Sequence, residues 1–313
     1  MEILRSLASI RCGFLDALMS GITYLGSEVA FMAAALLMFW CVNKRQGYYV
    51  FLVGAFGTIC NQFLKLAFRI PRPWVLDPQF QIVESARAGA TGYSFPSGHT
   101  QNIVGTTAAI FACRKERAVR IVCVVLMLLV PFSRMYLGVH TPLDVGTAFL
   151  LALVLAAALY PAFRTEQTTR KAAPWLLLGA AALGLAFTLY AGSLARCDWP
   201  AGSEDLANLT NGLKNAYTML GALLGFLVAY FVDEKKLHFE VSAPFWGQVL
   251  KLVLGLALIL ALRAGLKPVL RAVFAGSQIE SAVRYFLIVL FAGIVWPLSF
   301  PWFQKIGKKG QKA

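Results

Sequence analysis

Long apolar runs are the feature of this sequence that most limits how the chain can fold. Crossing the roughly 30 Å hydrocarbon core of a bilayer takes about 20 apolar residues, and runs of this kind recur along the 313 residues. Only 14% of the residues are charged, against roughly 25% in soluble domains. We therefore predict an all-α, polytopic transmembrane helical bundle. The nine predicted spans are residues 22–42, 47–68, 97–113, 119–138, 143–163, 173–195, 213–232, 246–265 and 283–303.

Two of these predicted spans are unusual. The third, residues 97–113, is short, and the fourth, residues 119–138, is interrupted by Pro131 and Arg134. A proline and a charged side chain are disfavoured where a helix faces lipid. We therefore expect both helices to border a polar cavity.

The basic residues predict the orientation of the bundle. The net charge is +14, but the cations lie mostly in short loops between apolar runs, which is the pattern of membrane orientation and not of nucleic-acid binding. Fifteen of them fall on one side, against ten on the other outside the motifs below. We predict that the richer side is cytoplasmic, in a plasma membrane, with the N-terminus outside. The fifteen are Lys44, Arg45, Arg114, Lys115, Arg117, Arg120, Arg164, Arg170, Lys171, Lys235, Lys236, Lys305, Lys308, Lys309 and Lys312.

Three polar clusters in the first half of the chain fall at the predicted outer face. They are "KLAFRIPRP", "FPSGHT" and "SRMYLGVHTPLD". Ionisable residues at membrane depth are costly and usually mark function. The clusters bring together three cations, two of the three histidines and one acid, which are Lys65, Arg72, Arg134, His99, His140 and Asp144.

The second cluster indicates an anion site at the start of a helix. Ser97 is well placed as an N-cap, with Gly98 and His99 in the first turn. A helix start offers free backbone N–H groups and a positive dipole end, which suit a phosphate. Gly98 has no side chain, so its amide can be approached closely.

The third cluster contains a second helix start. Thr141 is a plausible N-cap, Pro142 suits the first helical position and Asp144 suits the third. Asp144 can then reach back to His140, and a carboxylate on one imidazole nitrogen leaves the other free to attack. A metal site is the rival interpretation, but three nearby cations would repel a divalent ion.

These clusters match a known signature. The spacing K-x6-RP, then PSGH, then SR-x5-H-x3-D resembles the three-part signature of the type-2 phosphatidic acid phosphatase superfamily, which includes membrane lipid phosphate phosphatases. The match covers residues 65–73, 96–99 and 133–144 without a departure at any motif position.

The resemblance implies a role for each motif residue. His140 would be the nucleophile, forming a phosphohistidine, with Asp144 orienting it and His99 acting as general acid. Water would then release phosphate from His140, and no metal or other cofactor is implied. The groups that would hold the phosphoryl oxygens are Lys65, Arg72, Ser97, the Gly98 amide and Arg134.

The rest of the chain is less informative. We expect residues 1–165 to form the phosphatase core, including the first five spans, and residues 166–313 to add four spans of unknown role. Residues 1–20 have apolar residues at helical spacing, which predicts a helix at the membrane interface or one packed on the bundle. The outer loop, residues 196–212, is placed to cover the site.

The predicted function is metal-independent hydrolysis of a lipid phosphate or diphosphate, with the active site on the extracytoplasmic side. A soluble phosphate ester is an alternative substrate. Vanadium haloperoxidases share the motifs, but they are largely soluble. A binding or transport protein that retains the pocket is the alternative from another class, although we expect no buried charge pair in the last four spans, a feature of many transporters.

Overall fold

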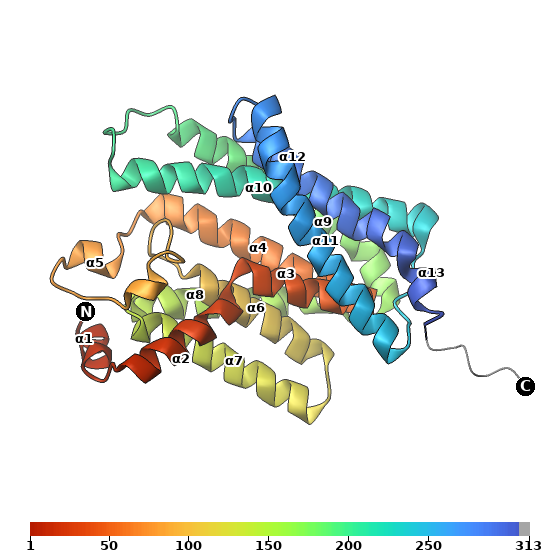
Figure 1. Ribbon diagram of the computed structural model, residues 1–313, viewed down its shortest axis with the longest axis horizontal. Coiled ribbons are helices and arrows are strands. Elements are labelled where there is room, and N and C mark those ends of the chain that lie inside the picture. The colour runs from red at the N-terminus through yellow and green to blue at the C-terminus, as the bar shows by residue number, and fades with distance from the viewer. Residues whose placement is uncertain (307–313) are drawn as a thin grey trace, which may run out of the picture. The chain divides into compact units, whose positions relative to one another are not determined.

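The computed structural model describes residues 1–306, and every regular element in this range is a helix (Figure 1). The predicted all-α class is confirmed. Lys308, Lys309 and Lys312 of the predicted cytoplasmic tail lie outside the described residues, as does the end of the predicted segment 166–313.

Seven helical segments of the described chain are long and apolar enough to cross a membrane. The pair Gly13–Gly26 and Glu28–Val42, bent by 52°, would make an eighth. The predicted total of nine is not confirmed, because α6 (Gly98–Cys113) has only 16 residues and is not among them. The seven are Lys44–Leu76, Arg117–Tyr136, Pro142–Phe163, Glu166–Leu194, Glu204–Leu237, Phe245–Val273 and Ile279–Phe303.

The chain forms two compact units, which we describe separately. The first unit comprises residues 1–32, 53–161 and 190–213, and the second comprises the remaining described residues. Four α-helices contribute residues to both units. They are α3 (Glu28–Leu37), α4 (Lys44–Phe68), α9 (Glu166–Leu194) and α10 (Glu204–Val232).

Helix α6 forms the centre of the first unit. It packs against both α7 (Arg117–Tyr136) and α8 (Pro142–Leu159) (Figure 1). All its residues from Thr100 to Ala109 are buried. Protein surrounds its polar side chains, so this helix does not need the apolar surface of a lipid-facing span.

The N-terminal segment packs on the first unit. Leu4, on α1 (Glu2–Ser9), is fully buried in one cluster with Phe80, Leu137 and Val139. Of the two predicted arrangements for residues 1–20, the structure therefore has the helix packed on the bundle. The cluster supports the chain immediately before His140.

Arg11 also stabilises the segment that precedes His140. Its guanidinium donates to the backbone oxygens of Tyr136 (3.0 Å) and Gln81 (2.7 Å). Gly138 has φ +80°, and a Cβ there would lie 2.7 Å from Arg11 Nη2. Both the left-handed backbone and the close approach of Arg11 require glycine at this position.

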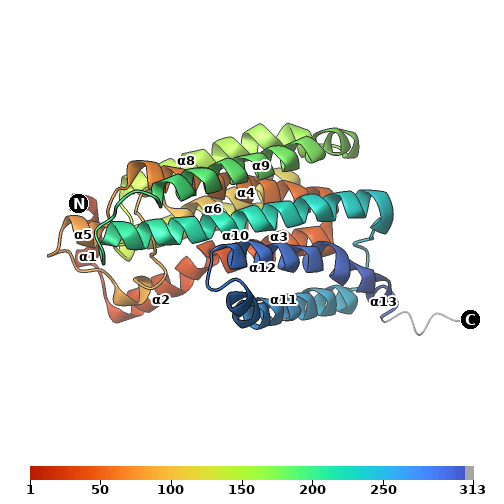
Figure 2. The ribbon, with the colours of Figure 1, turned by 90° about the horizontal axis from the view of Figure 1, so that it is seen from above.

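The second unit is built around α11 (Phe245–Val273) and α12 (Ile279–Leu290), which lie side by side (Figure 2). Trp40 Nε1 donates to the Ala292 carbonyl at 3.0 Å, and Trp296 Nε1 donates to the Lys251 carbonyl at 3.2 Å. Bonding the indole N–H groups allows large aromatic side chains to be buried here.

Three ion pairs lie in the second unit, and one of them, Arg45–Glu166 at 3.6 Å, involves an exposed glutamate. Lys44 Nζ is 2.7 Å from Asp233. Within α12, Arg284 is 3.0 Å from Glu280, and the two side chains are only 6% and 12% exposed. The expectation that the last four spans hold no buried charge pair is therefore wrong. The spacing of four residues places both side chains on one helix face, where each lowers the cost of burying the other.

Truncating Leu4 tests the role of the N-terminal helix. We expect Leu4→Ala to lower the free energy of unfolding by about 3 kcal/mol, because it removes a fully buried side chain from a packed cluster. Ile3→Ala, at the exposed neighbouring position, is the matched control. Thermal unfolding in detergent and amide hydrogen exchange over residues 1–10 measure the difference. Equal effects of the two substitutions would contradict the packing described.

Candidate active site

The first unit brings the three predicted clusters together. Lys65 lies near the end of α4, and Arg72 lies just before α5 (Pro73–Leu76). Arg134 lies in the last turn of α7. The remaining predicted residues begin two helices: Ser97, Gly98 and His99 at α6, and His140 and Asp144 at α8.

The start of α8 forms the predicted capping box. Thr141 Oγ1 accepts the Asp144 N–H at 3.3 Å, and Asp144 Oδ2 accepts the Thr141 N–H at 2.7 Å. Pro142 occupies the first helical position. This local structure places the Asp144 carboxylate beside the residue that precedes the cap, His140.

Asp144 joins His140 to a residue that the sequence motifs do not include. Its Oδ2 lies 3.4 Å from His140 Nδ1 and accepts the Ser94 hydroxyl at 2.6 Å. All three side chains are buried. Ser94 lies in an irregular loop, where no helical or strand period predicts which way a side chain points.

Arg72 contacts the other nitrogen of His140. Its Nη1 is 2.9 Å from Nε2. A guanidinium can only donate, so Nε2 carries the lone pair, and a neutral ring then has its proton on Nδ1, the atom that faces Asp144. Burial, followed by the charges of Arg72 and Arg134, lowers the pKa of His140 well below its usual value. His140 is therefore neutral near pH 7, with Nε2 as its nucleophilic atom.

Two of the three buried cations, Arg72 and Lys65, donate hydrogen bonds only to uncharged acceptors. Arg72 donates to the carbonyls of Thr91 (2.7 Å), Gly92 (2.9 Å) and Val139 (3.0 Å). Lys65 Nζ donates to the carbonyls of Tyr93 and Ser94. Neither forms an ion pair with a carboxylate within residues 1–306.

Arg134, the third cation, has fewer hydrogen-bond partners. Its Nη1 donates to Thr23 Oγ1 at 2.8 Å, while its buried Nε and Nη2 have no partner in the described part of the chain. The site thus contains three buried cations, Lys65, Arg72 and Arg134, and one buried acid, Asp144. An excess of buried positive charge is costly unless it is compensated, so the arrangement favours binding of an anion.

The start of α6 completes the anion site. Ser97 Oγ accepts from the N–H and the hydroxyl of Thr100, at 3.4 and 3.0 Å, and so caps the helix as predicted. A Cβ on Gly98 would meet only Asn61 Oδ1, at an ordinary 3.8 Å. Packing therefore does not require glycine here, and the open space lies next to a helix N-terminus.

His99 follows in the first turn of α6. Burial, followed by the charges of Arg134 and Arg72, lowers the pKa of His99 well below its usual value. Within residues 1–306, its side chain forms no hydrogen bond or ion pair that would occupy it. It is therefore available to exchange a proton with a bound group. All eight predicted site residues lie in the first unit.

The predicted outer loop, residues 196–212, also belongs to this unit, but its second part is helical because α10 begins at Glu204. Tyr93 Oη donates to Asp205 Oδ1, in the first turn of α10, at 2.6 Å, and the guanidinium carbon of Arg69 lies 4.9 Å from the centre of the Trp199 ring in the loop. The start of α10 thus contacts the segment whose carbonyls hold Lys65. The sequence predicted that residues 196–212 lie at the face of the site. It did not predict the hydrogen bond between Tyr93 and Asp205, which are 112 positions apart.

Known proteins match both halves of the chain. Residues 46–168 match the model of the PAP2 superfamily. Residues 217–309 match the model of the PAP2 superfamily phosphatase, transmembrane extension.

Individual relatives include two proteins of Bacillus subtilis (strain 168). Phosphatidylglycerophosphatase B is 30% identical over 161 residues, 47% of this chain and 74% of the relative. Undecaprenyl-diphosphatase BcrC is 29% identical over 147 residues, 45% of this chain and 71% of the relative. Sphingosine-1-phosphate phosphatase 1 of Mus musculus is 26% identical over 265 residues, 79% of this chain and 58% of the relative.

These matches and the membrane-spanning helices confirm the resemblance drawn from the three motifs. The matched range 46–168 contains the whole buried cation cluster and both histidines. The chain belongs to the PAP2 superfamily and is an integral membrane phosphatase of that family.

Proposed function

We propose that this protein hydrolyses a lipid phosphate or diphosphate through a phosphohistidine on His140, without a metal ion. The observation that carries the proposal is the buried excess of positive charge around a neutral, Asp-oriented histidine. The negative charge on a transferring phosphoryl group is stabilised by such a cluster. The same cations disfavour a divalent metal at this place.

The reaction proceeds in two steps. The bound phosphoryl anion offsets the cations that lower the pKa of His99, so His99 takes up a proton when substrate binds. His140 Nε2 then attacks phosphorus, the bond from phosphorus to the leaving oxygen breaks, and His99 gives that oxygen its proton. Water then attacks the phosphohistidine, the P–N bond breaks, and His99 takes a proton from the water as phosphate leaves. Asp144 stabilises the positive charge that develops on His140 in the first step.

Binding requires Arg72 to change partner. In the structure its Nη1 is hydrogen-bonded to the nucleophilic Nε2. A phosphoryl oxygen is a stronger acceptor for a guanidinium than an imidazole nitrogen, so the substrate takes this donor and frees the lone pair. The other phosphoryl contacts come from Lys65, Ser97, the Gly98 amide and the unpartnered Nε and Nη2 of Arg134.

A lipid is the substrate class that the comparisons support. The three relatives are named for phosphatidylglycerophosphate, undecaprenyl diphosphate and sphingosine 1-phosphate activities. In this proposal, residues 1–165 form the phosphatase core on the extracytoplasmic side of the plasma membrane, with the headgroup in the cation cluster and the tail in the bilayer. Residues 166–313 form the added membrane segment.

Phosphate release by the purified full-length protein tests the reaction. We expect release from at least one of a panel of lipid phosphates and diphosphates, undiminished by EDTA, and a fall of at least about 1,000-fold in kcat/KM for His140→Ala. The exposed His238 provides the control, His238→Ala, which should retain full activity. Soluble sugar phosphates in the same panel test the alternative substrate class. Retained activity in His140→Ala would rule out the phosphohistidine route.

The Ser94–Asp144–His140 chain predicts an order of effects. Asp144→Asn should lower kcat by about 100-fold or more, because the anion that orients and stabilises the ring is lost. Ser94→Ala should lower kcat by only about 10-fold, since it removes one donor to that anion. KM should change little in either. Ser9→Ala removes an exposed hydroxyl and serves as the control. A larger loss from Ser94→Ala than from Asp144→Asn would reverse the assigned roles.

A further inference from the structure

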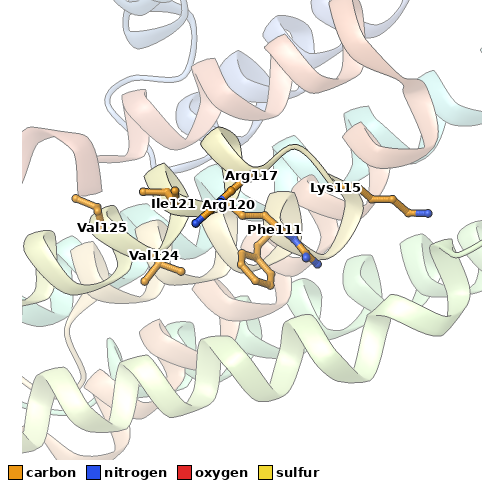
Figure 3. Close-up of a pocket in the computed structure, with 7 residues that line it drawn as sticks. All are labelled: Phe111, Lys115, Arg117, Arg120, Ile121, Val124 and Val125. Atoms are coloured by element: carbon orange, nitrogen blue, oxygen red, sulfur yellow. The ribbon is translucent and has the colours of Figure 1, made fainter.

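A pocket lies in the first unit, and none of the predicted active-site residues lines it. It forms where α6 ends and α7 begins, and its side chains are shown in Figure 3. Three of the seven lining residues are cations and the others are apolar. The lining residues are Phe111, Lys115, Arg117, Arg120, Ile121, Val124 and Val125.

The cations of this pocket have no acidic partner. Glu116 is the acid nearest to them in the sequence, and it is occupied by Arg114 at 2.5 Å. Within the described residues, none of Lys115, Arg117 and Arg120 forms an ion pair. Arg120 is stacked over the Phe111 ring, with 4.4 Å between its guanidinium carbon and the ring centre. This stacking holds one cation in place over an apolar surface.

The apolar residues continue along α7. Ile121, Val124 and Val125 are spaced three and four apart, so they share one helix face, and their side chains are 43–53% exposed. Because α7 is a membrane-spanning helix, this face meets acyl chains. Cations at the end of a span, followed by an apolar stripe inside it, match the headgroup and chain of one phospholipid molecule.

We propose that this pocket binds an anionic glycerophospholipid of the bilayer. Its headgroup phosphate contacts Lys115, Arg117 and Arg120, and one acyl chain lies along Ile121, Val124 and Val125. This end of α7 is the predicted cytoplasmic end, where basic pockets attract anionic lipids. Membrane orientation alone requires only that basic residues lie in the loop. It does not require an arginine stacked on an aromatic ring or an apolar stripe that continues from the charges.

Lipid retention by the full-length protein tests the site. The protein in nanodiscs of phosphatidylcholine is titrated with a fluorescent phosphatidylglycerol, and energy transfer from its tryptophans is measured. We expect saturable binding that weakens at least tenfold in Arg117→Gln/Arg120→Gln. The control Lys235→Gln/Lys236→Gln removes the same charge from another exposed basic pair and should bind as the unmodified protein does.

Competition experiments with unlabelled lipids and with inorganic phosphate identify the ligand. Unlabelled phosphatidylglycerol should compete with the fluorescent lipid, whereas unlabelled phosphatidylcholine and millimolar inorganic phosphate should not. Competition by inorganic phosphate would assign the pocket to free phosphate and overturn the lipid proposal. An equal loss in the two double variants would show a general charge effect and would overturn it as well.

An independent observation concerns the first turn of α10. Asp205 lies outside both matched ranges, residues 46–168 and 217–309, yet it accepts the Tyr93 hydroxyl at 2.6 Å. The backbone oxygen of the same Tyr93 accepts a hydrogen bond from Lys65 Nζ. Tyr93 thus connects the start of α10 to a cation of the phosphoryl site. Burial, followed by Asp205, raises the pKa of Tyr93, so its hydroxyl remains a donor.

We infer that Asp205 is a positioning residue for Lys65. By holding the Tyr93 side chain, it holds the Tyr93 carbonyl against the ammonium group that receives the phosphoryl oxygens. A second contact fixes the start of α10, because a Cβ on Gly212 would lie 2.8 Å from Leu66 Cδ2, beside Lys65 in α4. This inference rests on the proposed phosphatase reaction, which assigns Lys65 its role.

A mutant cycle tests the positioning role. Asp205→Asn and Tyr93→Phe should each lower kcat by about fivefold to tenfold with little change in KM, because a displaced Lys65 weakens transition-state contacts. The double variant should be no slower than the slower single variant, since both break one connection. Asp198→Asn, at an exposed position in the loop just before α10, is the control. All variants should unfold at the same temperature.

Affinity for orthovanadate, measured by calorimetry, separates this inference from the proposed function. Weaker vanadate binding in Asp205→Asn and Tyr93→Phe, but not in Asp198→Asn, supports the positioning role even if no substrate is hydrolysed. Unchanged kcat and vanadate affinity in Asp205→Asn, in a protein that hydrolyses its substrate, would overturn the positioning role alone. Absence of hydrolysis by the unmodified protein, with every substrate, counts against the proposed function alone.

Discussion

The buried guanidinium of Arg72 is the interaction on which the rest of the site depends. It bonds the carbonyls of Thr91, Gly92 and Val139 as well as His140 Nε2. One side chain therefore fastens the loop before α6 to the start of α8. Carbonyls and an imidazole satisfy its hydrogen bonds without neutralising its charge, so the contacts that stabilise the fold also leave a positive site for a phosphoryl group.

A second constraint is the central position of α6. Its polar side chains would be costly in contact with lipid, but they are buried: Asn102 donates to the Gly26 carbonyl, and Gln101 lies against Gly57 of α4. The site therefore lies at the end of a protein-covered helix, with the N-terminus of α6 available to an anion. Small residues make this possible: a Cβ on Gly57 would clash with the Gln101 amide, so α4 and α6 approach closely beside the site.

Segments far from the motifs hold the motif residues in position. The N-terminal helix packs Leu4 against Leu137 and Val139, just before His140. Asp205, in the first turn of α10, accepts the Tyr93 hydroxyl, and the Tyr93 carbonyl bonds Lys65. Residues near the chain start thus support the nucleophile, and a residue more than 100 positions beyond Tyr93 supports a cation. This arrangement gives the start of α10, outside the motif-bearing region, a part in the site.

Local properties of the sequence determined the helical class, most of the membrane spans and the two helix caps. Hydropathy acts over about 20 residues, and caps at Ser97 and Thr141 depend on neighbours within three positions. The motif spacing also identified the family. Only the tertiary structure decided that Arg72 meets His140 Nε2, that Ser94 meets Asp144, that Asp205 meets Tyr93, and that Glu280 and Arg284 are buried together. The first three contacts involve irregular loops, where no period predicts side-chain direction. The burial of the last pair depends on which face of α12 its neighbours cover, and the local pattern of a helix does not carry that information.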